Sequence, residues 1–528
     1  MLEELNHECG VAAVSLKDNK GTEDKALFYL YKLLLNLQHR GQLSAGVTTY
    51  NKNRAQLIDT YRNIGTVNEV FKTSLTEKSM GLFKKYAGNK GIGHVRYATF
   101  GKNKKMYAHP FERHHGRLWK WFSFCFNGNL VNYVPLRDEL EKKKEYHFIY
   151  DNDTEIVMHY LARDLTFDSG SRRSRMSKPD LRLVFKDLSE RFEGAYNIAF
   201  MNALGEMVVY RDPYGFRPMS YAIKDGNLLA ASESNALINC GYENYKALNP
   251  GEMIHVHNGS IEIKKCSKCP RKAHCMFEWV YFANVSSVLD GRSVYMCRTN
   301  LGKELAKLET EDVGKDHIVV PVPDSAKAAG DSLAYELGVP SREGLIRNRF
   351  VGRTFIEGSS RKDKIQSKYT MVKEILKDKK VLLCDDSIVR GATTEELVSA
   401  LKEDGGAKEV HVRVSCPPII GPCFYGIDMS TVNELLAPKF MKEAADSMPE
   451  KSAEKMAKHL NADSVIYQTI PGLVRSIGLP KTDLCMACLN REYITPLGKQ
   501  LAKIAIENFK KGIKETSRTY ETAIRCSC

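Results

Sequence analysis

Residues 381–394, with the sequence VLLCDDSIVRGATT, constrain the fold of this chain more than any other segment. The apolar run predicts a buried strand, which ends in Asp385 and Asp386 and opens onto a loop of small and hydroxyl residues. Backbone N–H groups and hydroxyls at the N-terminus of a following helix bind phosphate, and paired carboxylates bind ribose hydroxyls or Mg²⁺. An ordinary buried strand followed by a turn is the alternative. The pattern favours a sugar-phosphate site formed by Asp385, Asp386, Ser387, Gly391, Thr393 and Thr394.

Length and composition exclude several classes of protein. A chain of 528 residues is too long for one ordinary core, so we expect two to four domains. No segment approaches the roughly 18 apolar residues that span a membrane, and the N-terminus lacks the basic and apolar regions of a signal peptide. We therefore expect a soluble cytoplasmic protein with no membrane partner. In such a chain, 14 cysteines favour metal binding or catalysis over disulfides.

The net charge of +14 does not by itself indicate nucleic-acid binding, because the basic residues are spread along the chain. The densest basic cluster lies in a Ser/Gly-rich segment that is typical of a solvated loop. The excess positive charge fits anionic substrates at least as well, and we expect no nucleic-acid partner. The cluster comprises Arg172, Arg173, Arg175 and Lys178.

The pattern of apolar residues changes near residue 300. Residues 9–263 are rich in strand patterns, with helical patterns at 25–37 and 153–165. From about residue 300, helical and strand patterns alternate, which predicts a parallel sheet of βαβ units. Residues after 433 are mostly helical and charged in pattern.

Four N-terminal segments together resemble the class II glutamine amidotransferase domain, an N-terminal nucleophile (Ntn) hydrolase. Taken singly, each has a simpler interpretation: Cys9 as a core residue, Arg96 as a surface salt bridge, and the Asn127-Gly128 pair as a hairpin turn. Their combination favours the resemblance. The segments are CGV from Cys9, NLQHRGQLSAG at 36–46, GIGHVRYATFG at 91–101 and FNGNLVN at 126–132.

This resemblance implies roles for five residues. Cys9 would be the nucleophile that attacks the glutamine amide. Arg96 would bind the substrate carboxylate in a bidentate pair, and Asp153 would pair with its α-amine. Asn127 and Gly128 would form the oxyanion hole, through a side-chain amide and a backbone N–H.

In that family the nucleophile is the first residue of the mature chain, because its own α-amine serves as the general base. An internal Cys9 has an amide nitrogen, which cannot accept a proton, so we expect residues 1–8 to be removed as a propeptide. The family usually has His where Phe126 stands and an acidic residue where Leu43 stands. Neither is the nucleophile or a principal substrate contact, so we expect these departures to affect rate more than reaction type.

The second half extends the resemblance. Residues 381–394 resemble the phosphoribosyl-pyrophosphate (PRPP) motif of type I phosphoribosyltransferases. With four further segments they resemble the amidophosphoribosyltransferase family, in the expected order over about residues 5–495. The segments lie at 280–295, 320–329, 344–356 and 422–428.

Membership would imply a two-step reaction. Glutamine is hydrolysed to glutamate and ammonia, and the ammonia converts PRPP to 5-phosphoribosylamine and pyrophosphate, the first step of de novo purine biosynthesis. Mg²⁺ would accompany PRPP at Asp385 and Asp386. The resemblance also implies inhibition by purine nucleotides and a homotetramer.

The same resemblance assigns further PRPP contacts. Asp324 and Ser325 would form a second phosphate-binding loop. Arg349 and Arg353 would close over pyrophosphate, although solvated loop charge is the alternative for both. Ala392 stands where the family has a hydroxyl residue, so PRPP affinity is expected to be weaker unless Thr393 and Thr394 compensate.

Four cysteines match the ligands of the structural [4Fe–4S] cluster in the iron–sulfur subgroup of the family: Cys275, Cys423, Cys485 and Cys488. Four thiolates also suit zinc, and the spacing alone does not decide between the two. A second pair, Cys266 and Cys269, is outside the family pattern. It would compete for metal, bind zinc or lie in an exposed loop. The sequence assigns no role to Cys526 or Cys528.

The sequence thus predicts an α/β and α+β protein in five parts. A propeptide (1–8) precedes an Ntn-hydrolase αββα glutaminase domain (9–263) and a connector with one cluster ligand (264–299). A type I phosphoribosyltransferase parallel-sheet domain (300–432) and a helical C-terminal region with the CxxC ligands (433–528) follow. Two other functions remain open alternatives. A non-catalytic PRPP- or nucleotide-sensing paralogue is suggested by Leu43, Phe126 and Ala392, whereas another glutamine-dependent synthase would not carry DDSIVRG.

Overall fold

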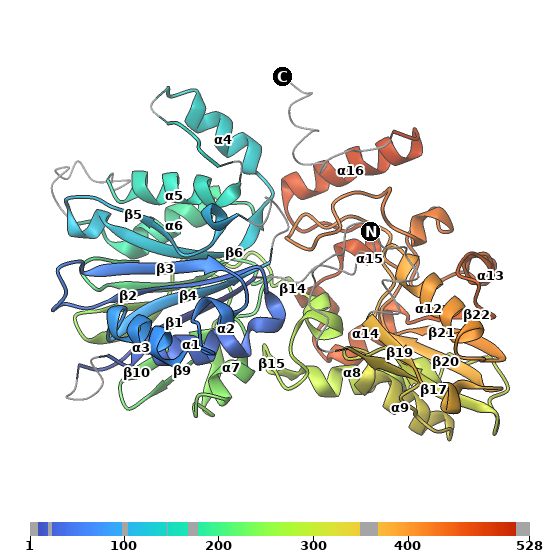
Figure 1. Cartoon of the computed structure of the whole chain (residues 1–528). Helices are drawn as coiled ribbons and strands as arrows, with labels where there is room; N and C mark the ends of the chain where they lie inside the picture. The colour runs from blue at the N-terminus through green and yellow to red at the C-terminus, as the bar shows by residue number, and fades with distance from the viewer. Residues whose placement is uncertain are drawn as a thin grey trace.

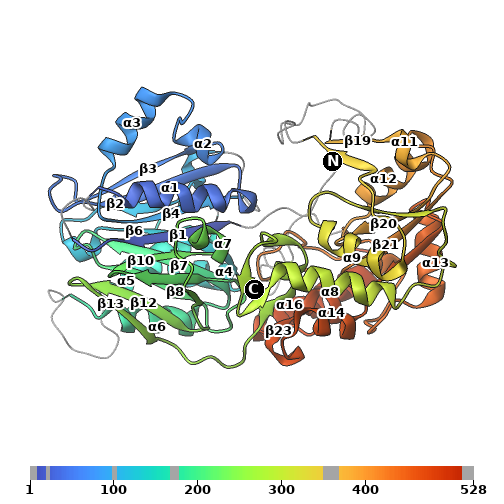
Figure 2. The ribbon, with the colours of Figure 1, turned by 90° about the horizontal axis from the view of Figure 1, so that it is seen from below.

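The computed structural model describes residues 9–18, 24–97, 104–144, 146–150, 152–166, 178–348 and 368–513. It consists of an N-terminal unit of two stacked sheets beside a C-terminal unit built on a parallel sheet (Figure 1). The view from below in Figure 2 shows α8 and α16 on the side of the C-terminal unit that faces the N-terminal one.

The first sheet of the N-terminal unit has seven antiparallel strands. Residues of β1 alternate between two cores, because successive side chains of a strand point to opposite faces. Val11 and Ala13 pack between the two sheets, whereas Ala12 and Val14 pack under helices on the outer face. The strand order is β11 (Tyr245–Ala247), β9 (Ser220–Lys224), β10 (Asn227–Ala231), β1 (Gly10–Ser15), β4 (Lys90–Arg96), β2 (Ser44–Tyr50) and β3 (Ile58–Ile64).

The second sheet has six antiparallel strands and packs face to face on the first. Its order is β13 (Ser260–Lys265), β12 (Glu252–His257), β8 (Met207–Arg211), β7 (Gly194–Asn202), β6 (Phe122–Leu130) and β5 (Phe111–Arg113).

Helices cover both outer faces and complete an αββα sandwich, which confirms the predicted fold of this domain (Figure 1). The helical patterns at 25–37 and 153–165 are confirmed as α1 and α5. On the first sheet lie α1 (Ala26–Asn36), α2 (Val67–Val70), α3 (Thr76–Lys85) and α7 (Ser234–Ile238). On the second lie α4 (Tyr133–Glu141), α5 (Asp153–Asp164) and α6 (Leu181–Arg191). Short 3₁₀ turns are η1 (Gln38–Arg40), η2 (Lys105–Tyr107) and η3 (Leu118–Lys120).

The C-terminal unit is built on a four-stranded parallel sheet, as the alternating pattern predicted. Its order is β17 (His317–Pro321), β20 (Lys380–Asp385), β21 (Glu409–Val414) and β22 (Ser464–Tyr467). One face packs against α8 (Val294–Ala306) and α9 (Lys327–Leu337), and the other against α12 (Ala392–Glu403) and α13 (Glu450–His459). A small hairpin of β18 (Leu345–Arg347) and β19 (Tyr369–Met371), with α11 (Lys373–Leu376), lies beside the sheet.

One predicted boundary is wrong. The sheet was expected to end before residue 433, but β22 comes from the region that was expected to be helical and pairs with β21. It is only four residues long and alternates in burial, a signal too short to stand out between helices. The rest of that region is mostly helical, with η5 (Ala437–Lys439), α14 (Ile470–Ile477), η6 (Lys481–Asp483), β23 (Leu484–Cys485), α15 (Ala487–Asn490) and α16 (Pro496–Lys510).

The connector and the C-terminal region tie the two units together. β14 (His274–Cys275) pairs with β23, and Phe216 of the N-terminal unit stacks on Tyr425 with ring centroids 4.4 Å apart. Arg217 donates to the carbonyl oxygen of Tyr425 at 2.7 Å. The connector also contains the π-helix η4 (Glu278–Phe282) and the hairpin of β15 (Val288–Leu289) and β16 (Arg292–Ser293). Within the described ranges, no helix has the length and apolar character needed to cross a bilayer.

Candidate functional site

Cys9 lies at the edge of the sandwich, directly before β1. Because Gly10 pairs with Val95, Cys9 lies beside Arg96, the last residue of β4. Its sulfur is 3.5 Å from the carbonyl oxygen of Tyr97. Burial raises the pKa of the Cys9 thiol, and the positive charge of Arg96 opposes this rise. The thiol therefore needs a base to become a nucleophile near neutral pH.

Arg96, at the end of β4, and Asp153, at the start of α5, both lie near Cys9. Arg96 is buried, which rules out a surface salt bridge, and its guanidinium lies 5.4 Å from the centre of the Tyr107 ring. Asp153 begins α5 and accepts the N–H of Leu130 at 3.2 Å, close to the Asn127-Gly128 pair of the same strand. The negative charge of Asp153 raises the pKa of the Cys9 thiol, in addition to the effect of burial. A buried cation and a carboxylate therefore lie on either side of Cys9, the predicted nucleophile.

Asn127 and Gly128 lie within β6, opposite Asn197 and Tyr196 of β7, so the hairpin-turn interpretation is wrong. Asn127 is 1% exposed, and its amide Nδ2 has no hydrogen-bond partner among the described residues. A buried donor without an acceptor is unfavourable, which fits a group that waits for a developing oxyanion. At Gly128 a Cβ would lie 1.9 Å from the carbonyl oxygen of Ala195, so close packing also requires this glycine.

The two departures from the family pattern have structural partners. The carbonyl of Phe126 contacts Nε2 of His94 at 3.1 Å, and its N–H donates to Nδ1 of His109 at 3.4 Å. The two imidazoles stack with centroids 4.2 Å apart. Leu43 donates its N–H to the carbonyl of Arg96 at 3.0 Å. These residues support the site through their backbones, which a change of side chain leaves in place.

The buried histidines predict that stability falls in acid. Burial lowers the pKa of His94 to about 3, below the ordinary value near 6.5. The unfolded chain therefore takes up a proton below pH 6.5 that the folded chain does not. We expect a loss of about 2 kcal/mol in unfolding free energy from His94 between pH 7.5 and pH 5. Urea unfolding at several pH values measures it. His94→Gln should flatten the dependence, exposed His459→Gln should not, and an unchanged slope in His94→Gln would contradict the assignment.

The C-terminal unit contains a cavity of about 360 Å³ at the carboxyl end of β20. Every described residue that was predicted to bind PRPP lines it: Asp324, Ser325, Asp385, Asp386, Ser387, Gly391, Thr393 and Thr394. Arg349 and Arg353 lie outside the described residues. The segment therefore lines a cavity, and its assignment to PRPP stays a prediction.

The two aspartates are buried and held by hydroxyl and backbone donors. Asp386 accepts hydrogen bonds from Ser325 and from Ser387, the latter at 2.6 Å. Its N–H donates to Asp385 at 2.9 Å. Two carboxylates at the end of a parallel strand fit Mg²⁺ and ribose hydroxyls, and the hydrogen bond from Ser325 connects the segment after β17 to Asp386.

The N-terminus of α12 lines the same cavity. Gly391 precedes the helix with φ of 86°, in the left-handed region that favours glycine. The first helical residue is Ala392, which lines the cavity where a hydroxyl was expected, and Thr393 and Thr394 follow it. Within α12 the i→i+4 hydrogen bonds begin with the N–H of Glu395, so the N–H groups of the first turn, at residues 392–394, are the ones that a bound anion could accept.

Sequence reasoning missed several residues of this cavity. Arg298 is buried and donates to the carbonyls of Tyr281 and Ala283. Burial lowers the pKa of its guanidinium, and the negative charge of Asp386 opposes this shift. His39 lines the same cavity although it belongs to the glutaminase domain. Arg298 lies outside the segments that the family resemblance marks, and local sequence spacing does not show which side chains face a cavity formed by distant segments.

A buried ion group connects the two sites. Arg40 donates to the carbonyl of Cys9 at 3.2 Å, to Glu233 at 2.6 Å and to Glu278 at 2.7 Å. Glu278 begins η4, whose later residues Tyr281 and Phe282 line the PRPP cavity. The nucleophile and the cavity are therefore joined by a short chain of contacts.

The four matched cysteines gather between the two units. Parallel pairing of β14 with β23 sets Cys275 opposite Cys485. The carbonyl of Cys488 accepts N–H groups from Ile420 and Gly421, near Cys423. Burial raises the pKa of all four thiols, and neighbouring members of the set raise it further for Cys275, Cys485 and Cys488. Cys266 is buried, with its sulfur 3.2 Å from the carbonyl of Arg182, so the exposed-loop interpretation is wrong for it.

Comparison with known proteins matches one domain family to the N-terminal unit and another to the C-terminal unit. The glutamine amidotransferase domain family matches residues 105–239, and the phosphoribosyl transferase domain family matches residues 297–421. The amidophosphoribosyltransferase of Methanothermobacter thermautotrophicus is 36% identical over 95% of this chain and 97% of its own length. That of Bacillus subtilis is 33% identical over 93% and 95%.

Two solved structures cover nearly the whole fold. Glutamine PRPP amidotransferase from B. subtilis, complexed with ADP and GMP, has a TM-score of 0.77 and 32% identity over 93% of this chain and 98% of its own. A structure described as the allosteric regulatory enzyme of purine biosynthesis has a TM-score of 0.79 and 32% identity, over 93% and 97%. These relatives, matched over nearly their whole length, show that the chain belongs to the amidophosphoribosyltransferase family, glutamine-dependent enzymes that transfer an amide nitrogen to PRPP in purine biosynthesis.

Proposed function

We propose that this chain hydrolyses glutamine at Cys9 and delivers the ammonia internally to PRPP in the cavity at Asp385 and Asp386. The observation that carries the proposal is the contact chain through Arg40, which touches both the nucleophile and the helix that lines the cavity. Internal delivery has a chemical reason. Free ammonia is mostly protonated at neutral pH, and ammonium is not a nucleophile.

At the first site, the Cys9 sulfur attacks the side-chain amide carbon of glutamine. The thiol proton passes to the α-amine of Cys9 itself. Arg96 and Asp153 hold the substrate carboxylate and ammonium, and Asn127 with Gly128 stabilises the oxyanion. The C–N bond breaks, the nitrogen takes the proton and leaves as ammonia, and a thioester remains. Water then hydrolyses the thioester and releases glutamate.

At the second site, ammonia attacks C1 of PRPP, the C1–O bond breaks, and pyrophosphate leaves with the bonding electrons. The N-terminus of α12 holds the 5′-phosphate, and Asp385 and Asp386 hold the ribose hydroxyls and Mg²⁺. When bound by these two carboxylates, Mg²⁺ would neutralise charge on the leaving pyrophosphate. Arg298 adds a cation on the wall of the cavity.

The proposal includes a mature chain that begins at Cys9, because only a free α-amine can accept the thiol proton. Intact-mass measurement on active protein should therefore show that residues 1–8 have been removed. A variant in which Cys9 is preceded by an uncleavable residue should bind glutamine without turning it over. Active protein that retains residues 1–8 would contradict this part of the proposal.

We also propose one structural [4Fe–4S] cluster on Cys275, Cys423, Cys485 and Cys488. Four buried thiols gathered in one place suit either zinc or a four-iron cluster. The match of these four positions to the iron–sulfur subgroup of the family supports the cluster.

Anaerobic purification should give brown protein with about four irons per chain. Cys485→Ser should be poorly soluble or unfolded, because the cluster joins β14, β23 and the loop of Cys423. Cys297→Ser is the control, since Cys297 is buried in the hydrophobic core against which Cys275, Cys423 and Cys488 pack but is no proposed ligand. Zinc in place of iron in active protein would contradict the cluster, and a fully active Cys485→Ser would contradict its structural role.

We propose further that the enzyme is cytoplasmic, is a homotetramer and is inhibited by purine nucleotides. The nucleotide complex of the B. subtilis relative supports the last point. A glutaminase assay with and without PRPP tests the function as a whole. Stimulation of glutamate release by PRPP, with pyrophosphate as co-product, is expected. Binding of PRPP without pyrophosphate release would instead favour the sensing paralogue.

A further inference from the structure

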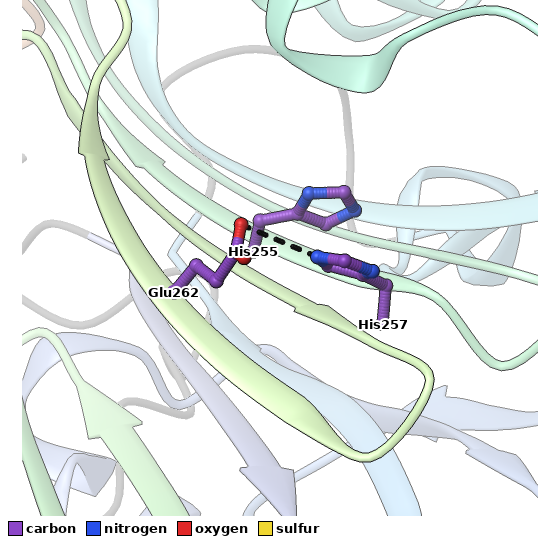
Figure 3. Close-up of side chains that lie close together, drawn as sticks. All are labelled: His255, His257 and Glu262. Atoms are coloured by element: carbon purple, nitrogen blue, oxygen red, sulfur yellow. Dashed lines mark ion pairs between the residues drawn. The ribbon is translucent and has the colours of Figure 1, made fainter.

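The hairpin of β12 and β13 brings two histidines and a glutamate together on one face. His255 and His257 are two residues apart on β12 and therefore point to the same side. The register pairs His255 with Glu262 of β13, which places the carboxylate on that side too. Their ligand atoms all lie within 4.8 Å of one another, and Figure 3 shows the three side chains converging. In the part of the chain that the structure describes, no other group of three such side chains comes as close.

From this arrangement, we propose that His255, His257 and Glu262 bind a divalent transition-metal ion of the zinc, cobalt or nickel type. Two imidazoles and one carboxylate are a preferred ligand set for these ions, whereas Mg²⁺ and Ca²⁺ prefer oxygen ligands alone. With bonds of about 2.0–2.2 Å, the donors need to approach to roughly 3.5 Å, which small rotations of these partly buried side chains achieve. The remaining coordination positions take water or an external ligand.

The protein has the two donor types in the protonation states that a metal requires. Burial lowers the pKa of His255, and the neighbouring His257 lowers it further, so the His255 imidazole is neutral near pH 7. The hydrogen bonds from Lys264 and His257 hold the pKa of Glu262 below its usual range, so this carboxylate is ionised. Metal ligation requires both states.

An ordinary surface ion pair is the simpler explanation, since His257 and Glu262 are 3.2 Å apart and Lys264 also contacts Glu262. That explanation leaves His255 unaccounted for. Its Nε2 is buried and has no hydrogen-bond partner among the described residues. A polar atom in that state is unfavourable, and a metal ion beside it would satisfy it.

The surroundings carry enough negative charge for a cation. Besides Glu262, the carboxylates of Glu206 and Asp180 act on His255. Lys178 is paired with Glu206, and Lys264 is the cation that a metal would displace from Glu262. Ile254 and Val256, which alternate with the histidines, pack in the core between the sheets and fix the hairpin. None of the three ligands lines the PRPP cavity or belongs to the cysteine set.

Cobalt titration of untagged, anaerobically prepared holoprotein tests the site. We expect one added Co²⁺ per chain with weak visible bands of nitrogen and oxygen ligation, and without the intense near-ultraviolet band of thiolate ligation. His255→Ala and Glu262→Gln should each weaken this binding by at least about tenfold, since loss of an outer-shell partner alone costs that much. His459→Ala, at an exposed histidine elsewhere, should leave it unchanged.

Thermal melting separates a lost ligand from a damaged fold. Zn²⁺ should raise the melting temperature of the parent protein and of His459→Ala, but not of His255→Ala, while all three melt at similar temperatures without added metal. Equal affinity for Co²⁺ in the parent and His255→Ala, or a spectrum with thiolate ligation only, would overturn the proposal. Glutaminase activity should be the same in all variants.

Discussion

Replacing Cys9 with serine is expected to lower glutamine-dependent product formation by at least about 1,000-fold. A serine hydroxyl is far less acidic than a thiol, and burial already raises the pKa of Cys9 itself. Synthesis from added ammonia should persist, because the PRPP cavity contains no part of the thiol chemistry. Pyrophosphate release, measured with glutamine and then with ammonium at alkaline pH, gives the two rates.

Cys240→Ser provides the matched control, because Cys240 is a half-buried thiol in the same domain and belongs to neither site. It should retain both rates. Glutamine-dependent turnover that survives in Cys9→Ser would remove Cys9 from the mechanism. Loss of the ammonia-dependent rate as well would mean that the substitution had damaged the fold rather than the chemistry.

The second large effect is expected at Asp386. Asp386→Asn removes a buried negative charge that accepts hydrogen bonds from Ser325 and Ser387 and faces the cavity. Product formation should fall at least about 100-fold, because PRPP and its Mg²⁺ lose a ligand and a positioning contact. Basal glutaminase activity should remain, since Asp386 takes no part in the Cys9 site.

The control here is Asp331→Asn, an exposed carboxylate of α9 that pairs with Lys327 outside the cavity. Its product formation should match that of the parent. Asp386→Asn with the parental rate and unchanged PRPP affinity would show that the cavity has been assigned wrongly. Kinetics at varied PRPP, with separate assays for glutamate and pyrophosphate, distinguish these outcomes.

Local patterns allowed much of the fold to be predicted. β20 and α12 follow from an apolar run, paired aspartates and a glycine that precedes a periodic helix, and all of these signals lie within 25 residues. The helices α1 and α5 were equally clear. β22 was missed because four residues carry too little pattern, and its place in the sheet depends on pairing with β21.

The connection between the two sites could not be predicted in this way. Arg40, Glu233 and Glu278 are far apart in the sequence and meet only after both domains have folded. His39 gave no signal that it would line a cavity of the other domain. Asn127, which lies within β6, could be assigned a role only through the family resemblance, since a turn explained the local sequence equally well.

The most direct test of the central claim is the stoichiometry of the two half-reactions. Purified enzyme supplied with glutamine, PRPP and Mg²⁺, and with no added ammonium, should release glutamate and pyrophosphate in equal amounts from the first turnovers. That result requires both sites and internal transfer between them. Glutamate release without matching pyrophosphate, or pyrophosphate release only when ammonium is added, would contradict the proposed function.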